Sequence, residues 1–179
     1  VSSALDYLNL TILDARILTS RDNMTLDSYL VADIDGEPVK EESRLEEIRS
    51  RLTSILLDPE STVLHPNRRI PRQLKHFDTP TQISLSQDKA NHKTILEIIT
   101  GDRPGLLSLI GQAFIEANIH VENAKIATVG ERAEDIFLIT NQDREPITNE
   151  DRLIKLKEIL LRLLDSDKSK QEQPTAINL

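Results

Sequence analysis

The sequence predicts an α+β fold in which helices cover one face of an antiparallel sheet, and two observations carry this prediction. First, the chain repeats itself: residues 9–57 run parallel to residues 118–164, with one small length change inside the first hairpin turn. Second, both copies pass from the alternating apolar pattern of strands to the three-four spacing of an amphipathic helix. The repeat therefore predicts two units of one design.

Each copy begins with two strands joined by a turn. The alternating segments are residues 10–19 and 26–32 in the first copy, and residues 119–128 and 133–140 in the second. Within the last strand, residues 136–139 are apolar on both faces. One face would meet the helices, so we expect the other to meet a second sheet or a subunit rather than water.

A helix follows the strands in each copy. Its apolar stripe consists of Leu45, Ile48, Leu52, Ile55 and Leu56 in the first copy, and of Leu153, Leu156, Leu160, Leu163 and Leu164 in the second. Ser43 with Glu46, and Thr148 with Asp151, fit the capping box, in which an oxygen-bearing side chain accepts from the free amides of the first turn. The sequence thus predicts that the two helices begin near Ser43 and Thr148.

The second copy extends further upstream. Residues 94–100 have the pattern of a strand, and residues 104–118 that of a helix. The apolar face of this helix consists of Leu106, Ile110, Ala113, Phe114 and Ala117. Strand-helix-strand-strand-helix is the order of a ferredoxin-like unit (βαββαβ), which a fourth strand closes. Residues 81–86 suit that role in the first unit, and residues 175–179 in the second.

The first copy starts late in this pattern. By the repeat offset, residues 1–8 match the last turns of the 104–118 helix, so the first unit lacks its opening strand and most of its first helix. The chain also starts with Val1 rather than methionine, and we expect a C-terminal fragment that begins within a domain. The predicted organisation is a truncated first domain at 1–86 with a linker-like insertion at 58–80, a connector at 87–93 and a second domain at 94–179.

Composition and charge exclude several classes of protein. The net charge is −8 and aromatic residues make up 3% of the chain, whereas nucleic-acid platforms need basic surfaces and stacking rings. No apolar run approaches the roughly 18 residues of a membrane span, and the N-terminus does not have the features of a signal peptide. Together with the absence of cysteine, this favours a cytoplasmic protein that contacts neither nucleic acid nor membrane.

Several segments carry a resemblance to a known family. The "DRPGLL" that follows the 94–100 strand resembles an ACT domain, a small module that commonly binds amino acids. The longer segments "RRIPRQLKHFDTPTQISLS" and "NAKIATVGERAEDIFLIT" resemble the C-terminal tandem ACT region of the bifunctional uridylyltransferase/uridylyl-removing enzymes, which modify the nitrogen signal protein PII. The resemblance covers nearly the whole chain. It implies two ACT units, glutamine as the ligand, and, for the full-length enzyme, PII as substrate and magnesium as cofactor.

The same resemblance sets an expectation about catalysis. The nucleotidyltransferase and HD-type hydrolase domains of the family are absent from this sequence, which also has no Gly-rich phosphate loop and no Gly-x-Ser-x-Gly elbow. We therefore expect a regulatory, amino-acid-sensing chain without catalytic activity of its own. Two alternatives stay open: a structural ACT pair that holds domains or subunits together without a ligand, and the regulatory tail of an amino-acid biosynthetic enzyme.

The turn "GDRPGLL" is the candidate ligand site. A helix that begins near Pro104 has unpaired amides at its start, and Gly105 lets a ligand or another backbone come close. These amides would hold the carboxylate of an amino acid, while Asp102 would pair with its ammonium group. The candidate ligand-binding residues are Asp102, Arg103, Pro104, Gly105, Leu106 and Asn118. The competing interpretation is that Asp102 only caps the helix and Gly105 only relieves crowding against the sheet.

Other polar groups are weaker candidates. Asp33 and Asp35 resemble the acidic pair of a metal site. The second copy has "NQDRE" at the same hairpin exit, and this equivalence favours a solvated turn in both copies. The four histidines, His65, His76, His92 and His120, lack the spacing of a zinc pair. We therefore expect no metal site.

Two features suggest association with other surfaces. The basic residues Arg68, Arg69, Arg72, Lys75 and His76 cluster in the linker, which is either a solvated connector or, as we favour, a docking strip for an acidic surface. The first unit, without its opening strand, would expose a sheet edge and leave Leu10, Ile12 and Ile17 uncovered. We therefore expect the chain to form a homodimer.

Overall fold

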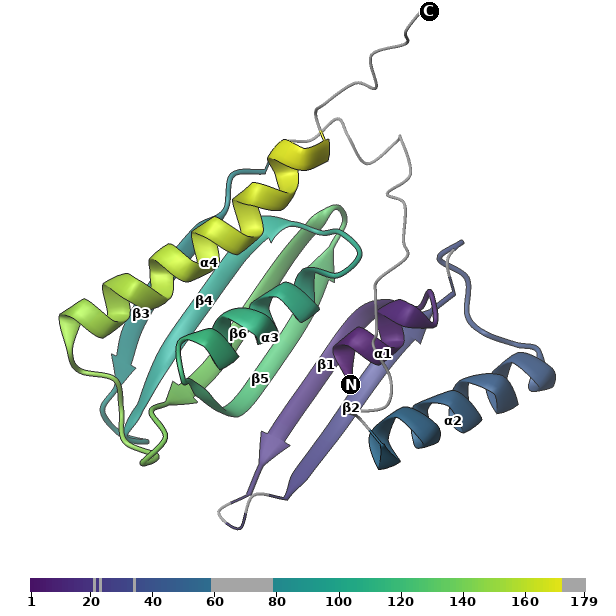
Figure 1. Ribbon diagram of the computed structural model, residues 1–179, viewed down its shortest axis with the longest axis horizontal. Coiled ribbons are helices and arrows are strands. Elements are labelled where there is room, and N and C mark those ends of the chain that lie inside the picture. The colour runs from purple at the N-terminus through teal and green to yellow at the C-terminus, as the bar shows by residue number, and fades with distance from the viewer. Residues whose placement is uncertain (21, 23, 34, 59–78, 172–179) are drawn as a thin grey trace, which may run out of the picture.

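A single six-stranded antiparallel sheet runs through the computed structural model, which describes residues 1–20, 22, 24–33, 35–58 and 79–171. The strand order is β2-β1-β5-β6-β4-β3. In Figure 1, α1, α3 and α4 lie over one face of the sheet, and α2 lies to the side of β2. The elements are α1 (Ser2–Tyr7), β1 (Thr11–Thr19), β2 (Thr25–Ala32), α2 (Glu42–Leu57), β3 (Gln82–Asp88), β4 (Lys93–Gly101), α3 (Leu106–Glu116), β5 (His120–Val129), β6 (Arg132–Thr140) and α4 (Glu150–Gln171). The prediction of an α+β fold with an antiparallel sheet is confirmed.

The two repeat units join through one pair of strands, β1 and β5. Arg16 pairs with Lys125, and the repeat offset makes these two residues equivalent positions of the two copies. The neighbouring pairs exchange equivalent positions in the same way, Ala15 with Ile126 and Ile17 with Ala124. An approximate two-fold axis therefore passes between Arg16 and Lys125. This pairing satisfies the backbone groups along two strand edges that would otherwise face water.

Backbone irregularities recur at the same places in both units. Asn9 and Asn118, each just before the strand that follows the first helix, have positive φ angles of 59° and 54°. A register shift follows in both strands, between Ile12 and Asp14 in β1 and between Val121 and Asn123 in β5. Asparagine tolerates the left-handed region better than most residues, which explains its use at both turns.

The position of β3 corrects one prediction. Residues 81–86 were expected to close the first unit, but β3 pairs with β4, with Ile83 opposite Ile98, at the far end of the sheet from β1 and β2. The expected connector at 87–93 contains the short turn of this hairpin. A short hairpin needs little chain to close, so β3 takes the fourth-strand place of the second unit. The alternative closing strand, residues 175–179, lies outside the described residues.

Two hydrophobic clusters support the sheet. The larger one packs α3 and α4 against the second unit, and includes the buried residues Leu96, Ile98, Ile110, Phe114, Phe137, Ile139, Leu156, Leu160 and Leu164. The smaller one, formed by Leu5, Leu8, Leu10 and Ile48, joins α1 and α2 to the first unit. Leu10 is fully buried in this cluster, Ile12 is partly buried against both clusters and Ile17 is partly buried against the larger one, so the expectation that all three lie uncovered is wrong.

The helix starts differ from the predicted capping boxes. α2 begins at Glu42, so Ser43 lies inside its first turn, and no side chain caps the helix. α4 begins at Glu150, and the side chain of Asn149 accepts a hydrogen bond from the Arg152 amide at 3.0 Å. Asn149 thus has the role that the sequence assigned to Thr148, because asparagine caps a helix at least as well as threonine.

The open face of the sheet carries exposed apolar residues. Ile136 in β6 is 42% exposed there, while Phe137 and Ile139 of the same strand are buried beneath the helices. The basic linker residues expected to form a docking strip fall in 59–78, outside the described residues. Within the part of the chain that the structure describes, no helix is both long and apolar enough to cross a bilayer.

The core predicts a clear contrast between two substitutions in α4. Leu160 is fully buried, so Leu160→Ala should reduce the free energy of unfolding by about 2–5 kcal/mol, through lost apolar burial and a residual cavity. Ile154 is 55% exposed, and Ile154→Ala should cost less than about 1 kcal/mol. Urea denaturation of both variants measures the difference. Equal losses would contradict the assignment of Leu160 to the core.

Candidate functional site

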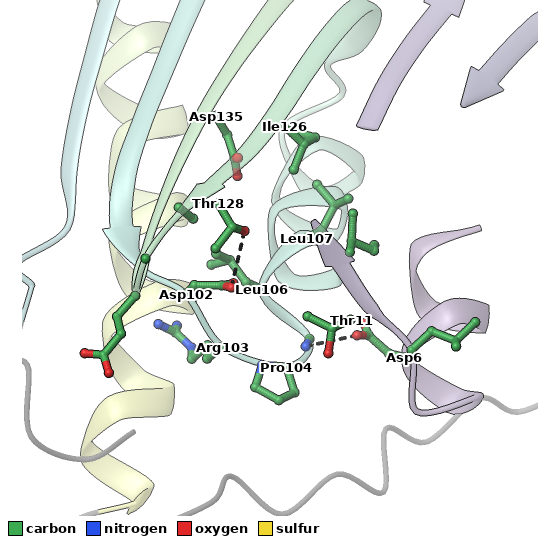
Figure 2. Close-up of a pocket in the computed structure, with 16 residues that line it drawn as sticks. Asp6, Thr11, Asp102, Arg103, Pro104, Leu106, Leu107, Ile126, Thr128 and Asp135 are labelled. Atoms are coloured by element: carbon green, nitrogen blue, oxygen red, sulfur yellow. Dashed lines mark hydrogen bonds between the residues drawn. The ribbon is translucent and has the colours of Figure 1, made fainter. Parts of the chain in front are cut away.

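A cavity of about 180 Å³ lies between the two repeat units (Figure 2). One wall is the turn 102–107, a second is Asp6 with residues 10–12, and the third comes from β5 and β6. At roughly 30 Å³ per molecule this volume equals about six waters, well below the roughly 300–1,000 Å³ of drug-sized pockets. The cavity therefore has the size for a small metabolite such as one amino acid.

The turn before α3 has the geometry that its sequence requires. Gly105 is the N-cap residue of α3 and has a φ angle of 81°, in the left-handed region. A Cβ atom placed on Gly105 would meet no atom within 4 Å, so glycine is required here by its backbone conformation and not by crowding. The interpretation that Gly105 only relieves crowding against the sheet is therefore wrong.

Asp102 ties the turn to the neighbouring strands. Its backbone amide donates to the Glu131 carbonyl at 2.9 Å, and its carboxylate accepts from the Thr128 hydroxyl at 3.3 Å (Figure 2). Arg103 donates from its guanidinium to the Leu164 carbonyl in α4. These contacts hold the turn between the β5–β6 hairpin and α4.

The carboxylate of Asp6 lies at the start of α3. Its Oδ1 accepts a hydrogen bond from the Gly105 amide at 3.2 Å (Figure 2). Its Oδ2 accepts from the Ser108 hydroxyl at 2.6 Å. Asp6 belongs to α1 and is 7% exposed. The sequence predicted that amides at this helix start would hold a ligand carboxylate, but did not identify Asp6 as the group that accepts from the Gly105 amide. The only signal was one acidic residue within the otherwise apolar stretch "ALDYL".

The cavity is acidic. Four carboxylate side chains line it, those of Asp6, Asp102, Glu131 and Asp135. Burial raises the pKa of Asp135 to about 7, with the nearby Asp102 charge adding to the effect, while a hydrogen bond from the Ala127 amide opposes it. A group with an ammonium would find favourable partners here, because each carboxylate stabilises a positive charge.

Five of the six predicted site residues meet at this cavity. Asp102, Arg103, Pro104, Gly105 and Leu106 all line it. Asn118 does not, because it follows the C-terminal end of α3, where its side chain accepts from Gln142 at 3.1 Å. The equivalent segment of the first unit, residues 10–12 after Asn9, does line the cavity. The pairing of β1 with β5 places the first unit, and not the second, opposite the turn.

The weaker candidates are explained by local structure. Asp33 lies 3.6 Å from the Arg44 guanidinium, and Asp35 accepts from the Glu37 amide, as expected for a hairpin exit. His120 lies 3.8 Å from Glu122, whose carboxylate also contacts a lysine and an arginine. Among the described residues, no group of three His, Cys, Asp or Glu side chains could hold a metal ion.

Curated relatives cover nearly all of this chain. It is 44% identical over 176 residues to the bifunctional uridylyltransferase/uridylyl-removing enzyme of Stutzerimonas stutzeri, which is 98% of this chain and 20% of that protein. The enzymes of the same name from Pseudomonas putida and Pseudomonas aeruginosa are 43% identical over 176 and 177 residues, with the same shares. No protein-family model matches the chain. The chain thus spans about 20% of the length of the relatives that it matches.

Asp135 predicts a specific dependence of stability on pH. Its pKa is about 7 in the folded chain and about 4 when unfolded, so the folded state binds more protons between these values and stability falls as the pH rises through them. Asp135→Asn keeps the group neutral and should raise the free energy of unfolding at pH 8 by about 2–4 kcal/mol, with little change near pH 4. Urea denaturation at both pH values measures this.

A matched control lies on the same strand. Glu134 is partly exposed on the opposite face of β6, and Glu134→Gln removes the same charge outside the cavity. It should change stability by less than about 1 kcal/mol at either pH. If Asp135→Asn behaved like this control, the raised pKa of Asp135 would be contradicted.

Proposed function

We propose that this chain is the amino-acid-sensing region of a bifunctional uridylyltransferase/uridylyl-removing enzyme, and that glutamine is its ligand. The observation that carries the proposal is the cavity between the repeat units, which is the size of an amino acid and combines a helix start with carboxylates. The names of the relatives support the enzyme class. The substrate of the whole enzyme in this proposal is the nitrogen signal protein PII, and its setting is the cytoplasm.

Ligand binding in this cavity would act on the arrangement of the two units. The turn 102–107 belongs to the second unit, whereas Asp6 and residues 10–12 belong to the first. A ligand that binds one arrangement more tightly shifts the population toward it, and can do so only by its difference in affinity. Two tandem ACT units that change their arrangement would bias the catalytic parts of the enzyme between adding and removing uridylyl groups. In this proposal catalysis, and the magnesium that serves it, belong to the parts of the relatives that this chain does not match.

A second candidate function has one observation in its favour. Because Asp6 already satisfies the Gly105 amide, the chain could be a structural ACT pair that binds no small molecule. In that case the cavity would be a by-product of joining the units. The titration below separates the two functions.

We also propose that the chain forms a homodimer through β2. Among the described strands β2 ends the sheet, with β1 on one side, and it carries the exposed side chains of Leu26 and Leu30. An unpaired strand edge readily pairs with a second copy, and a two-fold dimer closes after one such contact.

Calorimetric titration with glutamine tests the ligand. Gly105→Val should weaken binding at least tenfold, because a β-branched residue is strained at a φ angle of 81° and would displace the turn. Gly36→Val is the matched control, since Gly36 has a φ angle of 83° in a turn outside the cavity. Unchanged affinity in Gly105→Val would contradict the site. No binding by the unmodified chain would favour the structural function.

Light scattering over a concentration series tests the dimer. The unmodified chain should approach twice its monomer mass, whereas Leu26→Lys with Leu30→Lys should stay monomeric, because lysines along a strand edge oppose pairing. Ile115→Lys is the control, since Ile115 is 80% exposed in α3 of the second unit. A monomeric mass of the unmodified chain at high concentration would refute the dimer.

A further inference from the structure

Asp6 joins two helices that are far apart in the sequence. Its carboxylate accepts from the Gly105 amide and from the Ser108 hydroxyl, about 100 positions along the chain, with the shorter contact at 2.6 Å. Hydrogen bonds to an ionised group are short and strong, and a helix N-terminus favours a negative charge. The contact therefore holds α1, in the first unit, against α3, in the second.

The same amide is the group that would receive the carboxylate of an amino acid. We propose that the Asp6 carboxylate occupies the ligand carboxylate's position in the ligand-free chain, and that glutamine binds by displacing it from Gly105 and Ser108. This inference rests on the proposed function, and adds to it the step by which the ligand loosens the contact between the units. In the ligand-free chain, the Asp6 carboxylate holds α1 of the first unit against α3 of the second.

Displacement follows from the charge of the cavity. An amide has a single hydrogen, so the Gly105 N–H can serve one carboxylate well. A second carboxylate beside Asp6 would also face Asp102 and Glu131, in a partly buried space where like charges repel more strongly than in water. The ligand carboxylate and Asp6 therefore exclude one another. The ammonium of the ligand is not repelled in this way, because the remaining carboxylates of the cavity attract its positive charge.

The packing of α1 determines what moves on release. Leu5 and Leu8 of this segment belong to the smaller cluster with Leu10 and Ile48, and not to the larger cluster around α3. A freed Asp6 therefore leaves α1 attached to the first unit through this cluster, and without its hydrogen bonds to the start of α3. The β1–β5 ladder keeps the units joined, so the change is an opening at the helix layer.

Removal of Asp6 distinguishes two roles of its carboxylate, because they change the affinity for glutamine in opposite directions. If Asp6 held the ammonium of the ligand, its removal would weaken binding. If Asp6 competes with the ligand carboxylate, its removal strengthens binding. In calorimetric titrations of the full chain we expect Asp6→Ala to bind glutamine about tenfold more tightly than the unmodified chain. Asp6→Asn, which keeps the shape and one acceptor, should lie between the two.

The control for charge is Asp14→Ala. Asp14 is in β1 of the same unit, opposite Ala127 and outside the cavity, so its removal changes the net charge equally. Its affinity for glutamine should equal that of the unmodified chain. Weaker binding by Asp6→Ala than by Asp14→Ala, with both variants folded by circular dichroism, would overturn the proposal.

A second measurement needs no glutamine. Sodium acetate is a simple carboxylate, and amide resonances report where it binds when sodium chloride of equal ionic strength is the reference. We expect acetate to shift the Gly105 amide resonance in Asp6→Ala and to leave it unchanged in the unmodified chain. If glutamine bound neither chain but acetate behaved in this way, the glutamine proposal would fail and the occupant role of Asp6 would stand. An equal acetate shift in both chains would overturn that role.

The opening can be measured directly because the chain contains no cysteine. Tyr7 in α1 is 42% exposed and Ile115 in α3 is 80% exposed, so Tyr7→Cys with Ile115→Cys provides two sites for spin labels. Saturating glutamine should lengthen the distance between the labels, and Asp6→Ala should lengthen it without ligand. An unchanged distance in both experiments would contradict release of α1.

Discussion

The antiparallel pairing of β1 with β5 is the contact on which the rest of this structure depends. It joins two repeat units into one sheet and pairs equivalent residues, with Arg16 opposite Lys125 at the centre. Because the pairing is symmetric about that point, it brings the α1–β1 segment of the first unit next to the turn that starts α3. The cavity, the Asp6 contact and the burial of the first unit all follow from this register.

Electrostatics give the cavity its chemical character. The start of α3 would attract any anion, but Asp6 already lies there, and the charged groups that line the rest of the cavity are three further carboxylates and the Arg103 guanidinium. A ligand with both an ammonium and a carboxylate can use both features, since it pairs with the acids and competes for the amide. Burial keeps one of those acids, Asp135, partly protonated near neutral pH, which reduces the repulsion between the acids of the cavity.

The two units differ in how well they are supported. The second unit packs α3 and α4 over its strands, whereas the first depends on α1 and α2 with a smaller cluster around Leu10. Regions with less buried apolar surface open at lower free energy, so the first unit is the part whose position a small ligand could alter. Asp6 lies at this boundary, where its carboxylate contacts Gly105 and Ser108 of the second unit.

Short-range patterns in the sequence were sufficient for the repeat, the strands, the helices and the turn before α3. These features depend on apolar spacing and on the backbone preferences of single residues, which neighbouring residues largely decide. Long-range contacts were not predictable in this way. Alternation in residues 81–86 predicts a strand but not its partner. Asn118 was expected at the site, but the segment that lines the cavity is the equivalent one of the first unit, residues 10–12. The role of Asp6 likewise arises only when strand edges far apart in the chain meet, because edge pairing is chosen by the whole sheet and leaves little trace in local sequence.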